Sequence, residues 1–245
     1  MCKTKKYLIA AAVFAAAFVV FTTLVATVNV DYAGKYGVKV GFAAFNGAIF
    51  DFIGESKSCY KLSGITGLLV IAIGLAFAVL GVYQLIKRKS FKKVDKHLYA
   101  LAALYVVMAI VYVAFDEFPI NYRPTMPDGG ANEPSYPSTH TLIALTVGGA
   151  AVSEVFTYFK SARCRAALTS VIVVVCGVTV IGRILAGVHW ATDIIGGILL
   201  SASLVLFFLA AKSRLCFTDG CAAADDTEDK TNGKAGDSPD DTAVN

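Results

Sequence analysis

The chain has few charged residues and few cysteines. Only 16% of its 245 residues are Asp, Glu, Lys or Arg, whereas about a quarter is usual for a soluble globular protein. It has six cysteines, and they are too scattered to form the dense disulfide framework of a small secreted scaffold. The low charge also argues against a disordered regulator and against a nucleic-acid-binding protein, because both classes are rich in charge.

Apolar residues are abundant where charged residues are few. They make up 56% of the chain, and the mean hydropathy is +0.64. They lie in six blocks that are long enough to cross a bilayer, which takes about 20 residues at 1.5 Å each. The blocks are about twice as long as a barrel strand and do not alternate, so we predict helices. The predicted class is an all-α polytopic membrane protein with transmembrane helices near 7–28, 62–86, 97–115, 138–159, 166–183 and 189–211.

The first block has an alternative interpretation as a signal peptide, because three lysines precede it. The run from Tyr7 to Val28 is longer than the apolar core of a signal peptide, and no clear small-residue cleavage site ends it. We therefore expect a retained helix.

A shorter apolar segment, GFAAFNGAIFDFIG at 41–54, is broken by glycines and cannot span a membrane. Two interpretations stay open for it. It is either an amphipathic piece that lies in the membrane interface or a loop packed over the helical bundle.

The net charge of +4 is the sum of two unlike parts. Residues 217–245 hold eight acidic and two basic residues, and the rest of the chain holds 20 basic and 10 acidic ones. The acidic segment has no apolar period, so we expect a disordered tail at 217–245 beyond a membrane domain at 1–216, with a docking segment as the alternative.

The basic residues of the membrane domain predict its orientation. Six of them fall on one side of the predicted helices and fourteen on the other. The positive-inside rule places both chain ends in the cytoplasm and the loops near 29–61, 116–137 and 184–188 outside. The fourteen are Lys3, Lys5, Lys6, Lys87, Arg88, Lys89, Lys92, Lys93, Lys96, Lys160, Arg163, Arg165, Lys212 and Arg214.

The cysteines give no sign of a metal site or an exported disulfide. Only Cys59 clearly falls outside the predicted membrane, so it has no partner there. Cys216 and Cys221 lack the spacing of a zinc site. The remaining cysteines are Cys2, Cys164 and Cys176.

Five ionisable residues stand at the outer ends of predicted helices. A charge near a membrane span is costly, so such residues are functional candidates. They come from three regions that a bundle can bring to one outward-facing pocket. The five are Arg123, His140, Arg183, His189 and Asp193.

His189 and Asp193 are four residues apart at the start of the last helix, so they share a face. A carboxylate there can accept the Nδ1–H of the imidazole and leave Nε2 free as a nucleophile or base. For this pair alone, a satisfied buried polar pair is an equally good interpretation.

Arg123 and Arg183 suit a phosphate, because two planar guanidinium groups match its oxygens bidentately. Taken singly, each arginine also fits an interfacial residue whose charge reaches water. The sequence from Pro137 to His140 is typical of a helix start, whose first amides can bind an anion. An ordinary N-cap explains the same residues.

The order and spacing of these motifs resemble those of the type-2 phosphatidic acid phosphatase family, which includes vanadium haloperoxidases and bacterial lipid phosphatases. The family pattern is Lys-x6-Arg-Pro, then Pro-Ser-Gly-His, then Ser-Arg-x5-His-x3-Asp. The matching positions are Arg123-Pro124, Pro137-Ser138-Thr139-His140 and Gly182-Arg183 with His189 and Asp193.

The resemblance implies hydrolysis of a phosphate ester without metal or cofactor, through a phosphohistidine. His189 would be the nucleophile, Asp193 would orient it, and His140 would be the acid and base. The implied partners are the bilayer and a lipid phosphate, such as an isoprenyl diphosphate (undecaprenyl diphosphate), phosphatidate or phosphatidylglycerophosphate; no nucleic acid is expected. The substrate-binding set would be Arg123, Arg183, Ser138, Pro124, Thr139 and Gly182.

The chain departs from the family pattern in three places. Thr139 stands in place of a glycine, Gly182 in place of a serine, and Asp116 in place of the phosphate-binding lysine. Glu117 follows Asp116, and such a pair would repel a phosphate dianion. Either another group takes the role of the lysine, with Lys57 and Lys61 of the first outer loop as candidates, or the acids point away from the site, or the activity is reduced. Two other functions therefore stay open: a non-catalytic lipid-phosphate binder or transporter, and a lipid phosphotransferase.

Overall fold

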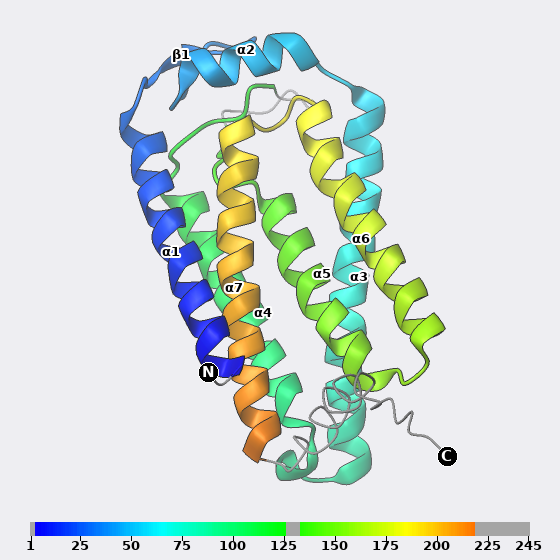
Figure 1. Ribbon diagram of the computed structural model, residues 1–245. Helices are drawn as coiled ribbons and strands as arrows, with labels where there is room; N and C mark the ends of the chain where they lie inside the picture. The colour runs from blue at the N-terminus through cyan, green and yellow to red at the C-terminus, as the bar shows by residue number, and fades with distance from the viewer. Residues whose placement is uncertain (1–2, 126–132, 219–245) are drawn as a thin grey trace, which may run out of the picture.

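The computed structural model describes residues 3–125 and 133–218 (Figure 1). Seven α-helices, one short 3₁₀ helix and one two-stranded hairpin make up this part of the chain. The helices are α1 Lys3–Thr27, α2 Ala43–Ile53, α3 Lys57–Arg88, η1 Phe91–Lys93, α4 Lys96–Glu117, α5 Thr139–Tyr158, α6 Ala162–Leu185 and α7 Ala191–Thr218. The strands are β1 Asp31–Ala33 and β2 Val38–Val40.

The structure confirms the predicted all-α class and its six long helices. In the described residues, six helices are long and apolar enough to cross a membrane. Each predicted block overlaps one of them, and the predicted domain boundary at 216 falls inside α7. The tail from 219 to 245, with Cys221, and Cys2 lie outside the described residues, as does the side chain of Cys216. The predicted disorder of the tail stays a prediction.

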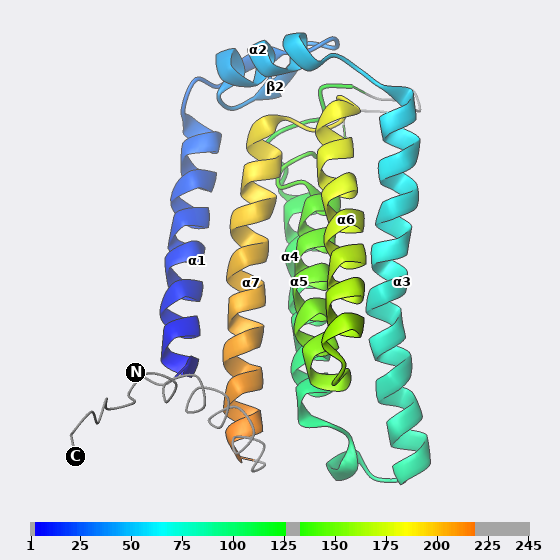
Figure 2. The same cartoon turned by 45° about the vertical axis from the view of Figure 1, so that its right-hand side comes forward.

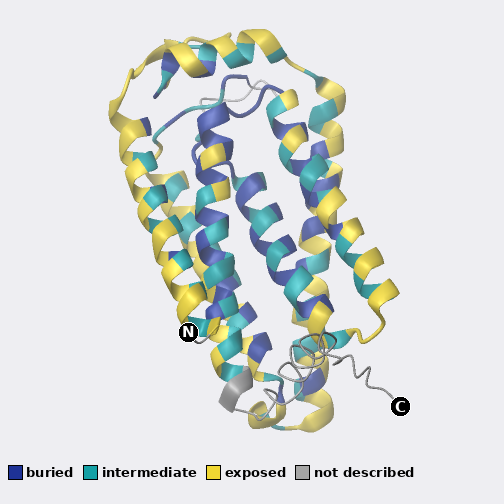
Figure 3. Ribbon diagram, viewed as in Figure 1, coloured by how far each residue is buried: buried dark blue, intermediate teal, exposed yellow. Residues whose placement is uncertain are grey.

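The six long helices run side by side, with α5 and α7 in the middle (Figures 1 and 2). Apolar side chains on the outer helices are exposed, such as Val19 on α1 and Val79 on α3. The buried residues are concentrated on α5 and α7 (Figure 3). An apolar surface of this extent is suited to lipid and not to water.

Small residues let α5 and α7 approach closely. A Cβ atom on Gly197 would lie 2.9 Å from Thr141, and one on Gly149 would lie 3.0 Å from Val205. Lipid is as apolar as a leucine side chain, so close packing and polar contacts must hold membrane helices together. The two central helices therefore depend on these glycines for their contact.

A cap covers one end of the bundle (Figure 2). It consists of the β1–β2 hairpin, which the sequence did not predict, and helix α2, which forms within the 41–54 segment. Asn46 of α2 donates to the hydroxyl of Thr192 in α7 at 2.9 Å and accepts from its backbone N–H at 3.2 Å. The segment thus packs over the bundle, while Phe45 and Phe52 stay exposed on the outer side of α2.

We predict that Asn46→Ala loosens the cap. Asn46 is 1% exposed and also donates to the carbonyl of Gly41 at 2.7 Å, so its removal leaves several buried groups unpaired. The free energy of unfolding should fall by about 2–3 kcal/mol, measured by denaturation in detergent. Asp51→Ala, at an exposed position of the same helix, is the control and should change it by less than about 0.5 kcal/mol.

Candidate active site

Three segments meet beneath the cap: the connection from α4 to α5, the end of α6, and the turn that leads into α7 (Figure 1). The backbone N–H of Ser138 donates to the carbonyl of Asp193 at 3.0 Å, which joins the first and third segments. The side chain of Arg183 contacts the Nε2 atom of His140, which joins α6 to α5. The structure thus brings the predicted histidines, Asp193 and Arg183 into one region.

His189 is buried with one ring nitrogen left unpaired. Its Nδ1 donates to the carbonyl of Ser135 at 3.1 Å and lies 3.6 Å from the Asp193 carboxylate. The predicted hydrogen bond to Asp193 is therefore replaced by one to the backbone, and Asp193 acts on the ring mainly through its charge. Nε2 is buried and has no hydrogen-bond partner among the described residues, so its lone pair is available.

Asp193 is held by two donors besides its neighbour His189. Its Oδ1 accepts from the side-chain amide of Asn121 at 2.9 Å, and its Oδ2 accepts from the backbone N–H of Trp190 at 3.0 Å. Asn121 is fully buried and also accepts from the backbone N–H of Gly41 at 3.0 Å. Sequence reasoning missed Asn121, since a neutral residue two positions before Arg123 carries no motif of its own.

The surroundings of His189 favour its neutral form. Burial is the largest cause that lowers its pKa, and the charges of Arg123 and Arg183 lower it further. The Asp193 carboxylate raises the pKa but does not restore its ordinary value. A neutral imidazole is the form that can act as a nucleophile.

Arg183 and His140 form a second polar pair beside His189. Arg183 is 4% exposed, and its guanidinium carbon lies 5.2 Å from the ring centre of Tyr60 in the first turn of α3. The Nε of Arg183 and the Nδ1 of His140 are buried and make no hydrogen bond within the described part of the chain. Unpaired buried donors are costly, so these atoms are candidate contacts for a polar ligand. Tyr60 is a site residue that the sequence did not indicate.

Arg123 lies at the edge of the site with a partial counter-charge. Its Nε is 3.2 Å from the carboxylate of Glu133, and its backbone N–H donates to the Glu133 carbonyl at 3.0 Å. Because its charge still lowers the pKa of His189, it lies within electrostatic range of that ring. The structure therefore gathers both predicted arginines, but only Arg183 is in contact with a catalytic candidate.

Ser138 is the N-cap of α5. Its hydroxyl accepts from the backbone N–H of Thr141 at 3.4 Å, and its own N–H is bonded to Asp193. The ordinary N-cap interpretation thus accounts for the groups of Ser138. The backbone N–H groups of Thr139 and His140 make no hydrogen bond in the described residues and can still bind an anion at the helix start.

Gly182 and Pro124 shape the site without pointing a polar side chain into it. A Cβ atom on Gly182 would lie 2.8 Å from the Cβ of Ser63, so α6 and α3 touch there. Pro124 packs against Gly34, a turn residue with φ of +76°. A Cβ atom added to Gly34 would lie 3.3 Å from the carbonyl oxygen of Pro124. Both residues make close packing contacts in this structure, and their predicted contact with substrate stays a prediction.

The acidic residues in place of the family lysine are exposed at the end of α4. Asp116 lines a shallow crevice with Tyr136, Pro137 and Thr139, and it forms no ion pair with either arginine. Lys57 and Lys61 are exposed on the first turns of α3. None of these four charged side chains is shown in contact with His140 or His189.

An apolar cavity of about 220 Å³ lies next to His140. It is bounded by α3, α4 and α5, and His140 and Thr139 stand on its lining. Its other lining residues are Gly64, Gly67, Leu68, Val70, Ile71, Tyr112, Ile143 and Ala144. A cavity with few polar groups, between helices that are long and apolar enough to cross a membrane, suits a hydrocarbon chain.

No group of three or more His, Cys, Asp or Glu side chains in the described residues is arranged to hold a metal ion. The charges that could neutralise an anion at this site are those of the two arginines.

The PAP2 superfamily matches the chain over residues 116–215, which include all three motifs. The chain is also similar to the crystal structure of a transmembrane PAP2-type phosphatidylglycerolphosphate phosphatase from Bacillus subtilis. The two are 18% identical, with a TM-score of 0.58 over 83% of this chain and 94% of that one, so the likeness is one of fold. No match was found among curated protein sequences. The resemblance seen in the motifs is borne out by this match over residues 116–215. The likeness of fold and the six long apolar helices of the described residues support a multi-pass membrane protein.

Proposed function

We propose that the chain is a membrane phosphatase that hydrolyses a phosphomonoester or diphosphate of a lipid through a phosphohistidine. The observation that carries this proposal is the unpaired Nε2 of buried His189, next to the unpaired groups of Arg183 and His140. If His189 and Asp193 served only as a structural polar pair, we would expect both ring nitrogens of His189 to have hydrogen-bond partners.

In the first step the Nε2 lone pair of His189 attacks phosphorus. The P–N bond forms as the bond between phosphorus and the leaving oxygen breaks. His140 in its imidazolium form gives its Nδ1 proton to the leaving oxygen and becomes neutral, while its Nε2 faces Arg183. The carbonyl of Ser135 and the charge of Asp193 stabilise the positive ring that results.

In the second step His140 takes a proton from water, and the water oxygen attacks phosphorus. The P–N bond breaks, free phosphate leaves, and His189 returns to its neutral form. Arg123, Arg183 and the two N–H groups at the start of α5 are the groups we propose to hold the phosphoryl oxygens. Arginine charge then takes the place that a metal ion holds in other phosphoryl-transfer enzymes, and no cofactor is part of this mechanism.

The proposed orientation places the capped end outside the cell and both chain ends in the cytoplasm. The distribution of basic residues supports it, since α1 begins and α7 ends at the end of the bundle opposite the cap (Figure 1). A lipid could present its phosphate to the site while its tail occupies the cavity beside His140. Undecaprenyl diphosphate, phosphatidate and phosphatidylglycerophosphate are the candidate substrates.

A non-catalytic lipid-phosphate binder or transporter is the second candidate, since acidic residues replace the family lysine. A lipid phosphotransferase is a third, in which an acceptor other than water takes the phosphoryl group. Release of inorganic phosphate in detergent with EDTA present favours the metal-independent phosphatase. Phosphate that appears only on a second lipid indicates the phosphotransferase.

We predict that His189→Ala abolishes phosphate release from a lipid phosphate and that His140→Ala lowers it by about a thousandfold. Both variants should elute as the wild type does on size exclusion, because neither histidine belongs to the apolar core clusters that hold the helices together. The arginine substitution Arg163→Lys, at an exposed position of α6, is the control and should leave turnover unchanged. Turnover at the wild-type rate by purified His189→Ala would rule out the nucleophile.

A second prediction concerns pH. Since burial and the arginines lower the pKa of His189, kcat/KM should fall on the acid side only below about pH 6.5, the ordinary histidine value. Asp193→Asn removes the charge that raises this pKa, so the acid limb should move to still lower pH while kcat drops by about two orders of magnitude. An acid limb that moves upward in this variant would contradict the assignment.

A third prediction tests the missing lysine. If Asp116 lies within reach of the bound phosphate, Asp116→Lys should raise kcat/KM by about threefold to tenfold, since it replaces repulsion by attraction. Glu117→Lys makes the same charge change at the next exposed residue and is the matched control. Equal gains in the two variants would mean that only the general surface potential has changed.

A further inference from the structure

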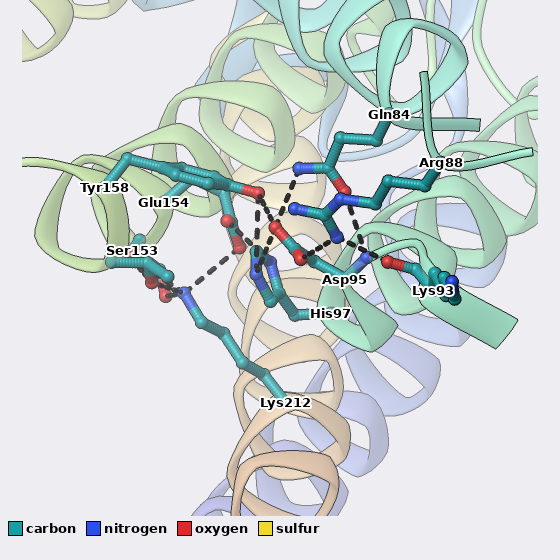
Figure 4. Close-up of polar contacts among 10 residues, drawn as sticks. Gln84, Arg88, Lys93, Asp95, His97, Ser153, Glu154, Tyr158 and Lys212 are labelled. Atoms are coloured by element: carbon teal, nitrogen blue, oxygen red, sulfur yellow. Dashed lines mark hydrogen bonds and ion pairs between the residues drawn. The ribbon is translucent and has the colours of Figure 1, made fainter. Parts of the chain in front are cut away.

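A cluster of buried charges lies at the end of the bundle opposite the cap (Figure 4). Glu154 of α5 is fully buried at the centre of it. Its carboxylate is 2.8 Å from Nδ1 of His97 on α4 and 3.0 Å from Nζ of Lys212 on α7. Burial of a carboxylate inside a membrane helix costs much free energy unless the carboxylate is paired, so this cluster is a candidate for a specific role.

Lys212 makes several polar contacts with α5. Its ammonium group donates to the carbonyl and the hydroxyl of Ser153, both at 2.8 Å, and to the hydroxyl of Thr157 at 2.6 Å. In the described part of the chain, all of its hydrogen-bond and ion-pair partners, Glu154 included, belong to α5. The contacts therefore tie one helix to another and leave Lys212 little capacity for a ligand.

An outer ring of contacts adds α3 and α4 to the cluster. Asp95, just before α4, accepts from Gln84 at 2.7 Å, from Arg88 at 2.9 Å and from Tyr158 at 2.9 Å. Burial alone would raise the pKa of Asp95, but these donors and the charge of Arg88 hold it below its usual value. These contacts keep the carboxylate of Asp95 ionised beside His97, whose Nε2 is 3.9 Å away.

The helices joined here are the ones that carry the catalytic candidates at the other end. Ser138 and Asp193 join α5 and α7 under the cap, and Glu154 and Lys212 join them at the far end. The 16 helical steps from Ser138 to Glu154 span about 24 Å. A straight helix pinned at both ends cannot slide or turn freely, and lipid supplies no hydrophobic force that would restore its position.

We propose that Glu154, Lys212 and His97 form a positioning clamp that fixes the register of α5 against α7 and so sets His140 opposite His189. The proposal rests on the proposed function, because the register matters through phosphoryl transfer. The three residues are positioning residues and touch no substrate.

The test compares Glu154→Gln, Lys212→Met, their combination, and Lys212→Arg as purified protein on a lipid phosphate. Each single change leaves a buried charge without its partner, so kcat per folded molecule should fall about tenfold, with KM changed less than about twofold. The double variant is neutral and should be less impaired than either single one. Lys212→Arg keeps the charge and should retain kcat within about threefold.

Lys87→Met is the matched control. It removes a lysine contact at the same end of the bundle, a hydrogen bond of 3.2 Å to Tyr83, but that contact lies within α3 and does not join α5 to α7. It should leave kcat unchanged. The second measurement is the rise in melting temperature caused by inorganic phosphate, which should shrink in Glu154→Gln and persist in Lys212→Arg.

The clamp is overturned if the single variants keep the wild-type kcat and phosphate response, or if their losses simply multiply in the double variant. A lower melting temperature with an unchanged kcat would show a structural role alone and would also overturn it. If the wild-type protein releases no phosphate, the proposed function is refuted and not the clamp. The rise in melting temperature caused by inorganic phosphate then still tests the clamp.

Discussion

Asp193 is the residue on which the separate segments of the site converge. Its carboxylate accepts from Asn121 and from the backbone of Trp190, and its carbonyl accepts from the N-cap of α5. Because Asn121 also bonds to Gly41 beside the cap, one buried acid connects the cap, the α4–α5 connection and the two central helices. The orientation of His189 follows from this framework, since its ring lies between Asp193 and the Ser135 carbonyl.

The same physical constraint appears at both ends of the bundle. Helices in lipid gain little from burying apolar surface against one another, so their relative positions depend on small residues and polar contacts. Close packing at Gly149 and Gly197 brings α5 and α7 together, and the polar contacts of Asp193 and Glu154 fix where along their length they meet. The polar contacts at the site and those of the far cluster therefore both hold α5 and α7 in register.

The sequence predicted the helices well because hydropathy blocks of this length leave a chain no other way to satisfy its backbone in lipid. It also predicted that His140, Arg183, His189 and Asp193 would meet, since their spacing puts them at helix ends. It could not predict Asn121, whose importance lies in a hydrogen bond 72 positions away in the chain. Nor could it separate Ser138 as a cap from Ser138 as a ligand, because both uses need the same hydroxyl at the same helix start.

The contact between Gly182 and Ser63 makes these two positions a size-matched pair. A serine at 182, as in the family pattern, would have to displace the side chain at 63 or push α3 away from α6. The helix that would move carries Tyr60 in its first turn, against the guanidinium of Arg183. The volume available at one glycine therefore determines how near an aromatic ring can come to the arginine, and a serine at 182 would need a glycine at 63 to be accepted.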